Sequence, residues 1–223
     1  MEQLNGTTRS GLDRDLEQIR SITIEMGELV DHAISRATQA LLGRDVAASN
    51  EVIRGDARVN ELQEQARLLC FSALERGAAV SRDIREILGF QHMTSELERM
   101  ADHCVNIARV ARDLADLPPI VEYIDLPKLS QLVAVQVRDM LSSLVAHDID
   151  QARGVAARDD LINRLYHRLV DELIAMMAEH AGTVYSGTKI IAVCQNLERI
   201  GDRVTNLAED LIFLETGEIE ELG

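Results

Sequence analysis

Four carboxylates form two pairs with the same spacing, and this spacing could bind cations. Glu98 and Asp102 are four residues apart, and so are Glu198 and Asp202, one hundred positions further along the chain. Because residues four apart lie on the same face of an α-helix, each pair would present two carboxylates side by side. Like charges at this spacing destabilise an isolated helix by about 0.2–0.5 kcal/mol, and a bound cation removes the repulsion. Each pair therefore predicts a cation site.

Other oxygen-bearing side chains extend both pairs. An asparagine follows each acid pair at the same spacing, and an Asp-x-x-x-Asn pair occurs earlier in each half of the chain. Carboxylate and amide oxygens suit Mg²⁺, Mn²⁺ or Ca²⁺, and carboxylate-rich clusters also bind iron. We expect the earlier pairs to supply oxygens from a neighbouring helix. These additional candidate ligands are Asp56, Asn60, Asn106, Asp159, Asn163 and Asn206.

The alternative is that the acids lie on a solvated surface and are neutralised by arginine. Arg99 and Arg199 each precede an Asp by three residues, where an ion pair can form on a helix. A single acid pair would fit this interpretation. Its repetition at equivalent positions favours cation binding.

Motifs for catalysis are absent from the sequence. No Asp or Glu is followed three residues later by His, whereas ferritin-like di-iron bundles use Glu-x-x-His on their ligand helices. The chain also lacks the glycine-rich phosphate loops, the Gly-x-Ser-x-Gly nucleophile motif and His-Glu-x-x-His. We therefore expect a protein that is not an enzyme.

Long amphipathic helices must position the acids. Apolar residues recur every three or four positions, and no segment shows the sustained alternation that marks a strand. The three prolines, Pro118, Pro119 and Pro127, lie near the middle of the chain and interrupt the helical pattern. Gly43 and Gly77 are expected to end the first two helices in the left-handed conformation. The predicted helices cover residues 12–42, 45–76, 81–117, 126–146, 148–180 and 186–215.

This pattern predicts an all-α protein formed by internal duplication. Each half contains three long helices joined by short turns, which pack most simply as an antiparallel three-helix bundle. We expect two tandem bundles, at residues 10–117 and 128–216, with a proline-containing linker at 118–127.

Composition restricts the partners and the compartment. The net charge of −15 argues against a basic surface that binds nucleic acid. The three cysteines have no Cys-x-x-Cys spacing, which favours buried thiols in a reducing compartment. No segment reaches the roughly 18 apolar residues of a membrane span. We expect a cytoplasmic protein that does not insert into a membrane and reaches one only through partners.

The repeated segment resembles a motif of the PhoU family, whose members regulate bacterial phosphate transport. Residues 97–102 read Leu-Glu-Arg-Met-Ala-Asp, and residues 197–202 read Leu-Glu-Arg-Ile-Gly-Asp, which is closer to the family's Glu-Arg-Ile-Gly-Asp pattern. Gly55-Asp56 with Val59-Asn60 is similar to the family's second-helix motif. The first copy departs from the pattern at Ala101, whose methyl group lies beside the acids. The resemblance extends over residues 12–214.

The resemblance implies a structure, a cofactor and a role. It implies two three-helix bundles, often dimeric, in the cytoplasm. It implies metal clusters at Glu98 and Asp102 and at Glu198 and Asp202, with the metal left open among Mg, Mn, Fe and Zn. It further implies a negative regulator of the phosphate-starvation response that connects a phosphate ABC transporter to a sensor histidine kinase.

Two other functions are compatible with the sequence. The chain could be an accessory protein of a low-affinity phosphate permease. It could also be a metal-binding helical scaffold or store that is unrelated to phosphate.

Overall fold

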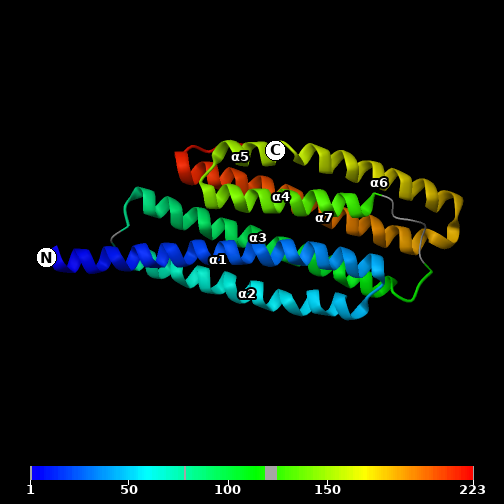
Figure 1. Cartoon of the computed structure of the whole chain (residues 1–223), viewed down its shortest axis with the longest axis horizontal. Helices are drawn as coiled ribbons and strands as arrows, with labels where there is room; N and C mark the ends of the chain where they lie inside the picture. The colour runs from blue at the N-terminus through cyan, green and yellow to red at the C-terminus, as the bar shows by residue number, and fades with distance from the viewer. Residues whose placement is uncertain (1, 78, 119–124, 223) are drawn as a thin grey trace.

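The computed structural model describes residues 2–77, 79–118 and 125–222, with side chains from residue 9 onward. Within these ranges the chain is helical and contains no β-strand, as predicted. In chain order the helices are α1 (Glu2–Gly43), α2 (Val46–Glu75), α3 (Ser81–Leu114), α4 (Leu126–Ala146), α5 (Ile149–Ala156), α6 (Asp159–Glu179), the short 3₁₀-helix η1 (Ala181–Thr183) and α7 (Val184–Thr216) (Figure 1).

The same capping interaction begins the second helix of each half. Asp45 precedes α2 and accepts a hydrogen bond from the backbone N–H of Ala48 at 2.9 Å. Asp148 precedes α5 and accepts the equivalent bond from Gln151 at 2.9 Å. Such N-terminal caps satisfy backbone donors that have no partner inside the helix. The duplication is therefore visible in the local structure as well as in the sequence.

The turn between α1 and α2 differs from the prediction. Gly43 is the last residue of α1, and Arg44 adopts the left-handed conformation with φ of 55°. His147, at the equivalent position of the second half, has the same φ. The Arg44 guanidinium donates hydrogen bonds to the carbonyl oxygens of Ala115 (2.8 Å) and Leu117 (2.6 Å). These bonds satisfy carbonyl groups just beyond the end of α3 and offset the strain of a side chain in this backbone region.

One predicted helix is divided into two. A single helix was expected over residues 148–180, but α5 ends at Ala156 and α6 begins at Asp159. Asp159 and Asp160 occupy the first turn of α6. Carboxylates are stabilised at a helix N-terminus by the helix dipole, so the break gives both aspartates a favourable position. The equivalent helix in the first half, α2, is continuous.

The fourth helix has the predicted bounds. α4 covers Leu126–Ala146, as expected for residues 126–146. Pro127 fits the first turn because its missing N–H would have no partner there. Residues 119–124 of the predicted linker lie outside the described residues.

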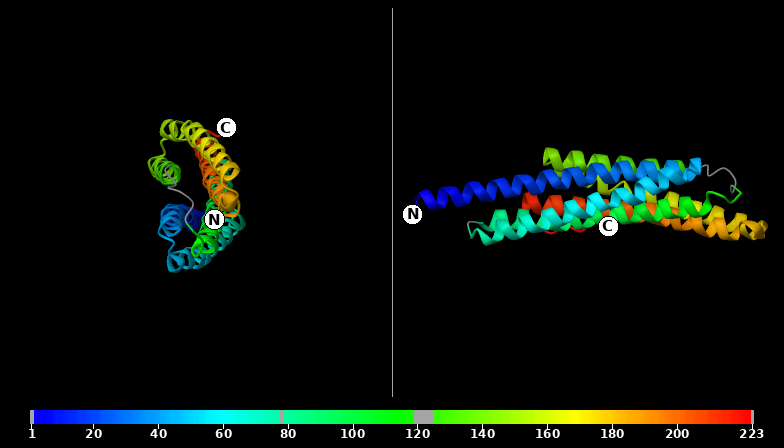
Figure 2. Two further views of the ribbon diagram at one scale, coloured as in Figure 1. Left: turned by 90° about the vertical axis from the view of Figure 1, so that its right-hand side faces the viewer. Right: turned by 90° about the horizontal axis from the view of Figure 1, so that it is seen from below.

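The two halves share one continuous hydrophobic core. α2 packs on α1 and α3 at one side, α5 and α6 pack on α4 and α7 at the other, and between them α1 lies beside α4 and α3 beside α7 (Figures 1 and 2). Leu97, Met100, Leu197 and Ile200 in the repeated segments are all 0% exposed. The apolar residues of both segments therefore anchor α3 and α7 in the core.

α3 and α7 run antiparallel, so the repeated segments lie near the middle of their contact. The ammonium group of Lys189 lies 2.9 Å from a carboxylate oxygen of Asp113 toward one end. The imidazole Nδ1 of His92 lies 2.7 Å from a carboxylate oxygen of Asp210 toward the other. In this antiparallel arrangement, a contact from one position of α3 to another position of α7 has a counterpart in which the two equivalent positions exchange helices.

Candidate metal centres

The first candidate centre joins α2 to α3. Glu98 and Asp56 are half-buried and Asp102 is exposed. Burial raises the pKa of Glu98 and of Asp56, and neighbouring carboxylates raise both further. Asn60 donates a hydrogen bond to Oδ2 of Asp56 at 3.0 Å, while Oδ1 of Asp56 is buried without a hydrogen-bond partner. The structure thus brings the acid of the second helix to the acid pair of the third.

The second candidate centre repeats this arrangement between α6 and α7. Glu198 and Asp159 are half-buried and Asp202 is exposed, as at the equivalent positions of the first centre. Burial raises the pKa of Glu198, and the carboxylates of Asp202 and Asp159 raise it further. Burial also raises the pKa of Asp159 and of Asp202. Asn163 donates a hydrogen bond to Oδ2 of Asp159 at 2.8 Å, matching the bond from Asn60 to Asp56.

Gln136 of α4 brings a further oxygen to the second centre, and the sequence pattern did not reveal it. Its side chain is only 2% exposed, and its Nε2 donates to Oδ1 of Asp159 at 3.4 Å. Its Oε1 is buried without a hydrogen-bond partner. An unsatisfied buried polar group costs about 1–3 kcal/mol. A glutamine on the apolar face of α4, next to Val137, is the signal that could have identified it.

The donor atoms suit a cation, but they are not assembled around one point. Buried oxygens without hydrogen-bond partners occur at Asp56, Gln136 and Asn163. Oxygen donors of this kind fit Mg²⁺, Mn²⁺, Ca²⁺ or iron better than Zn²⁺, which favours nitrogen and sulfur. Over the part of the chain that the structure describes, no three His, Cys, Asp or Glu side chains converge closely enough to hold a metal ion. A bound cation would have to draw the carboxylates together.

Two candidate ligands make other contacts. Asn106 accepts a hydrogen bond from Arg109 at 3.3 Å. Asn206 donates its amide to Glu96 of α3 at 2.8 Å. Arg99, the alternative partner of Asp102, donates instead to Glu96 at 3.2 Å. Asn60 and Asn163 thus contact an acid of their centre, whereas Asn106 bonds Arg109 and Asn206 bonds Glu96.

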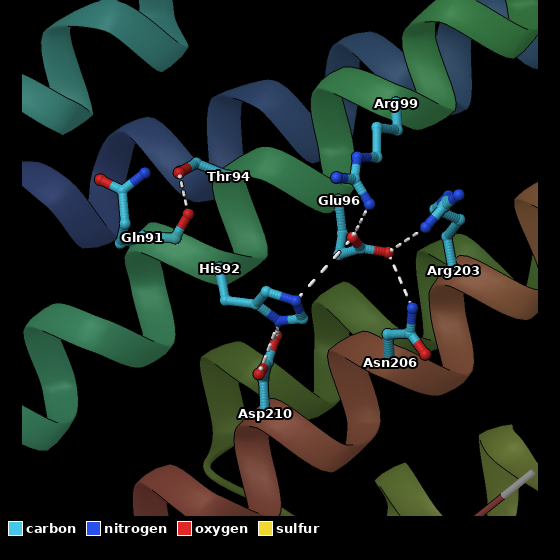
Figure 3. Close-up of polar contacts among 8 residues, drawn as sticks. All are labelled: Gln91, His92, Thr94, Glu96, Arg99, Arg203, Asn206 and Asp210. Atoms are coloured by element: carbon cyan, nitrogen blue, oxygen red, sulfur yellow. Dashed lines mark hydrogen bonds and ion pairs between the residues drawn. The ribbon is translucent and has the colours of Figure 1, made fainter.

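A buried polar cluster, which we call the Glu96 cluster, joins the two halves (Figure 3). Glu96 is 1% exposed and accepts hydrogen bonds from Arg203 at 2.9 Å and Asn206 at 2.8 Å. Burial alone would raise the pKa of Glu96, but these two hydrogen bonds hold it below the usual value of 4.5. His92 and Asp210 complete the cluster on the same side of the α3–α7 contact. The cluster connects α3 to α7 through charged hydrogen bonds.

The reciprocal positions carry a different pair. Asn196 is equivalent to Glu96, and His103 is equivalent to Arg203, each one hundred residues apart. Nδ1 of His103 lies 2.9 Å from Oδ1 of Asn196. Burial lowers the pKa of His103 below its usual value, which favours the neutral imidazole. The same contact between α3 and α7 is therefore charged at one position and uncharged at the other.

Two sequence-based expectations concern the chain as a whole. Cys70, Cys104 and Cys194 are buried and free, as predicted. None of the helices in the described ranges combines the length and the apolar character that crossing a membrane requires.

The fold and the acidic sites define an all-α protein of two tandem repeats, each with carboxylates clustered between its second and third helices. The PhoU domain family model matches residues 23–111 and 126–211, one match for each repeat. The chain belongs to the PhoU family.

Similar proteins cover almost the whole chain. The phosphate-specific transport system accessory protein PhoU homolog of Aquifex aeolicus is 34% identical over 208 residues, which are 93% of this chain and 94% of that protein. The homolog of the same name from Zymomonas mobilis is 30% identical, over 95% of this chain and 90% of that protein. The crystal structure of the phosphate transport system regulatory protein PhoU from Streptococcus pneumoniae superposes with a TM-score of 0.88 at 28% identity, covering 95% of this chain and 100% of that one. PhoU from Pseudomonas aeruginosa gives a TM-score of 0.89 at 28% identity, over 92% and 99%.

Proposed function

We propose that this protein is a cytoplasmic accessory regulator of a phosphate-specific transport system. The support is that similar proteins bear this description, that they match both repeats, and that the match covers more than nine-tenths of this chain. We further propose that it represses the phosphate-starvation response by connecting the transporter to a membrane sensor histidine kinase. This second step rests on the family resemblance of the two acidic motifs.

The same proposal includes cation binding at both centres. Glu98, Asp102 and Asp56 would hold the first cation. The equivalent acids of the second repeat, Glu198, Asp202 and Asp159, would hold the second. The observation that carries this proposal is the repetition of half-buried acids whose pKa values are raised by burial and by one another. A bound cation would supply positive charge that favours the ionised carboxylates.

The residues themselves define what the cation would change in the fold. In each repeat the acids come from two different helices, so a shared ion would tie the second helix to the third. Asn60 and Asn163 each hold Oδ2 of the neighbouring Asp. Oδ1 of Asp56 has no hydrogen-bond partner, and Oδ1 of Asp159 has only the long contact with Gln136, so both oxygens could turn toward an ion. Cation loading would therefore stiffen the outer helices, α2 and α6, on which partner proteins could dock.

The regulatory role is tested by affinity purification of the tagged full-length chain from cells grown in high and in low phosphate. Recovery of transporter subunits and of the kinase, with a change between the two conditions, is the expected result. Recovery of a low-affinity permease in their place would identify the alternative role. Deletion of the gene should derepress a phosphate-starvation reporter, and unchanged reporter activity would contradict the repressor role.

Cation binding is tested by elemental analysis of the purified protein. Glu198→Gln combined with Asp202→Asn should remove the metal of the second centre and leave that of the first. Metal content equal to that of the unmodified chain would refute the assignment of this centre. We also propose a homodimer, for which light scattering of the purified chain gives the mass directly.

A further inference from the structure

The two centres differ in the residue that the first helix of each repeat brings to the acids, and this helix carries none of the acidic motifs. In the second repeat, Gln136 of α4 reaches the acids, and only 2% of this residue is exposed. Its Oε1 has no hydrogen-bond partner, and its Nε2 contact to Asp159 is long at 3.4 Å. A buried carbonyl oxygen beside a carboxylate, with no donor to satisfy it, is placed as a cation ligand would be.

Gly201 shows where this oxygen points. A Cβ atom at Gly201 would lie 2.8 Å from Oδ1 of Asp159 and 3.3 Å from Oε1 of Gln136. Both oxygens therefore lie against the bare backbone of α7 between Glu198 and Asp202. Helices α4 and α6 therefore each bring one oxygen atom against the same residue of α7.

The first repeat lacks both of these features. The residue equivalent to Gln136 is Ala33, at the same offset of 103 positions that relates Asp45 to Asp148 and Asp56 to Asp159. Ala101 stands in place of Gly201. A cavity of about 130 Å³ remains here, and Ala33, Asp56 and Ala101 are among the residues that line it. The exposed side chains of His32 and Glu51 also line this cavity.

We propose that Gln136 is a cation ligand of the second centre only, so that the two centres have different coordination. This inference rests on the cation binding proposed above. In the second centre the protein supplies an additional amide oxygen. In the first centre water in the cavity beside Ala33 takes that position. The second centre then binds its cation more tightly and exchanges fewer of the ion's waters with solvent.

The test uses the full-length chain and Mn²⁺ as the probe. Glu98→Gln with Asp102→Asn leaves the second centre intact, and Glu198→Gln with Asp202→Asn leaves the first. Equilibrium dialysis monitored by electron paramagnetic resonance measures the affinity of each centre. Gln136→Met, which keeps the length of the side chain and removes the oxygen, should weaken the second centre by at least about 10-fold, because even partners outside the coordination shell contribute this much. The same substitution should leave the first centre unchanged, and Gln136→Glu should retain tight binding at the second.

Each outcome separates this inference from the proposal on which it rests. If neither single-centre background binds Mn²⁺, cation binding itself is refuted. If both bind and Gln136→Met leaves the affinity of the second centre unchanged, Gln136 is not a ligand and only the present inference falls. A variant that avoids disturbing α4 is Ala33→Gln, which should tighten the first centre and lower the solvent-proton relaxation caused by its Mn²⁺. No change in either quantity would overturn the inference, and circular dichroism without metal verifies that each variant is folded.

Discussion

Replacing Glu96 by glutamine should weaken the whole molecule, because Glu96 is the centre of the contact between the two repeats. The substitution keeps the shape of the side chain and removes its charge. Two hydrogen bonds from Arg203 and Asn206, at 2.9 and 2.8 Å, reach a carboxylate that is 1% exposed. A hydrogen bond to a charged group contributes about 1.5–3 kcal/mol, and a neutral one about 1 kcal/mol. The Arg99 contact adds little because that side chain is 54% exposed.

The expected loss is therefore about 1–4 kcal/mol of the free energy of unfolding at pH 7. For a chain of this length each kcal/mol lowers Tm by roughly 2–4 °C. Urea denaturation followed by circular dichroism measures the loss directly. The matched control is Glu25→Gln, because Glu25 pairs with Arg58 at 2.7 Å while both side chains are about half exposed (45% and 46%). This control should change stability by less than about 0.5 kcal/mol.

The loss should also depend on pH with a definite sign. The folded pKa of Glu96 lies below its usual value of 4.5. A carboxyl group of this kind contributes stability above the unfolded pKa and loses it as pH falls through the folded pKa. The difference between the unmodified chain and Glu96→Gln should thus be full at pH 7 and shrink below about pH 4.5. A difference within 0.5 kcal/mol at pH 7, or one that grows on acidification, would refute this account of the cluster.

The acidic centres give three further predictions. Gly201→Ala should displace Asp159, since the new Cβ would lie 2.8 Å from its Oδ1. Mn²⁺ binding measured by dialysis should therefore weaken. Gly154→Ala is the control, because nothing lies within 4 Å of its new Cβ, and it should leave Mn²⁺ binding unchanged. Saturating Mn²⁺ at 100 times its Kd should raise the free energy of unfolding by about 2.7 kcal/mol, and chelation should reverse the rise, so an unchanged Tm would contradict binding to the folded state. Glu98→Gln should stabilise the metal-free protein by a few tenths of a kcal/mol at pH 7. The pKa of Glu98 is raised, so its ionised form is unfavourable in the folded protein. The stability of the unmodified chain therefore falls as pH rises through this pKa. That gain should disappear below about pH 4, where the carboxyl group is protonated in both states, and a loss of stability at pH 7 would argue that Glu98 is neutralised within the metal-free protein.

The sequence predicted the features that depend on periodicity and repetition. Helical spacing located the elements, because each long helix has one apolar face and no internal proline. The repeated spacing of Glu98 and Asp102 located the acid pairs, because residues four apart share a helix face in any fold. The resemblance of the two motifs to a known family pointed to the family to which the chain belongs.

Features that depend on how helices face each other could not be predicted. Glu96 lies two residues before Glu98, and only the register of α3 against α7 decides that it is buried opposite Arg203. Gln136 stands out on the apolar face of α4, but only the packing of α6 and α7 against α4 shows that its side chain reaches Asp159. The break before Asp159 was not predicted because the apolar pattern continues across it. The carboxylates of Asp159 and Asp160, which are favourable in the first turn of a helix, determine where α6 begins.

The reciprocal contact of α3 with α7 has the geometry of an isologous interface, in which one surface binds a copy of itself. Here the two copies belong to one chain, so the molecule is built as a covalently joined pseudo-dimer of repeats. The two surfaces are no longer identical, however. Two first repeats would place Glu96 against His103, and two second repeats would place Arg203 against Asn196, so the ion pair between Glu96 and Arg203 would be lost in each case. The unlike pair is the favoured one, which disfavours contacts between two copies of the same repeat from different molecules.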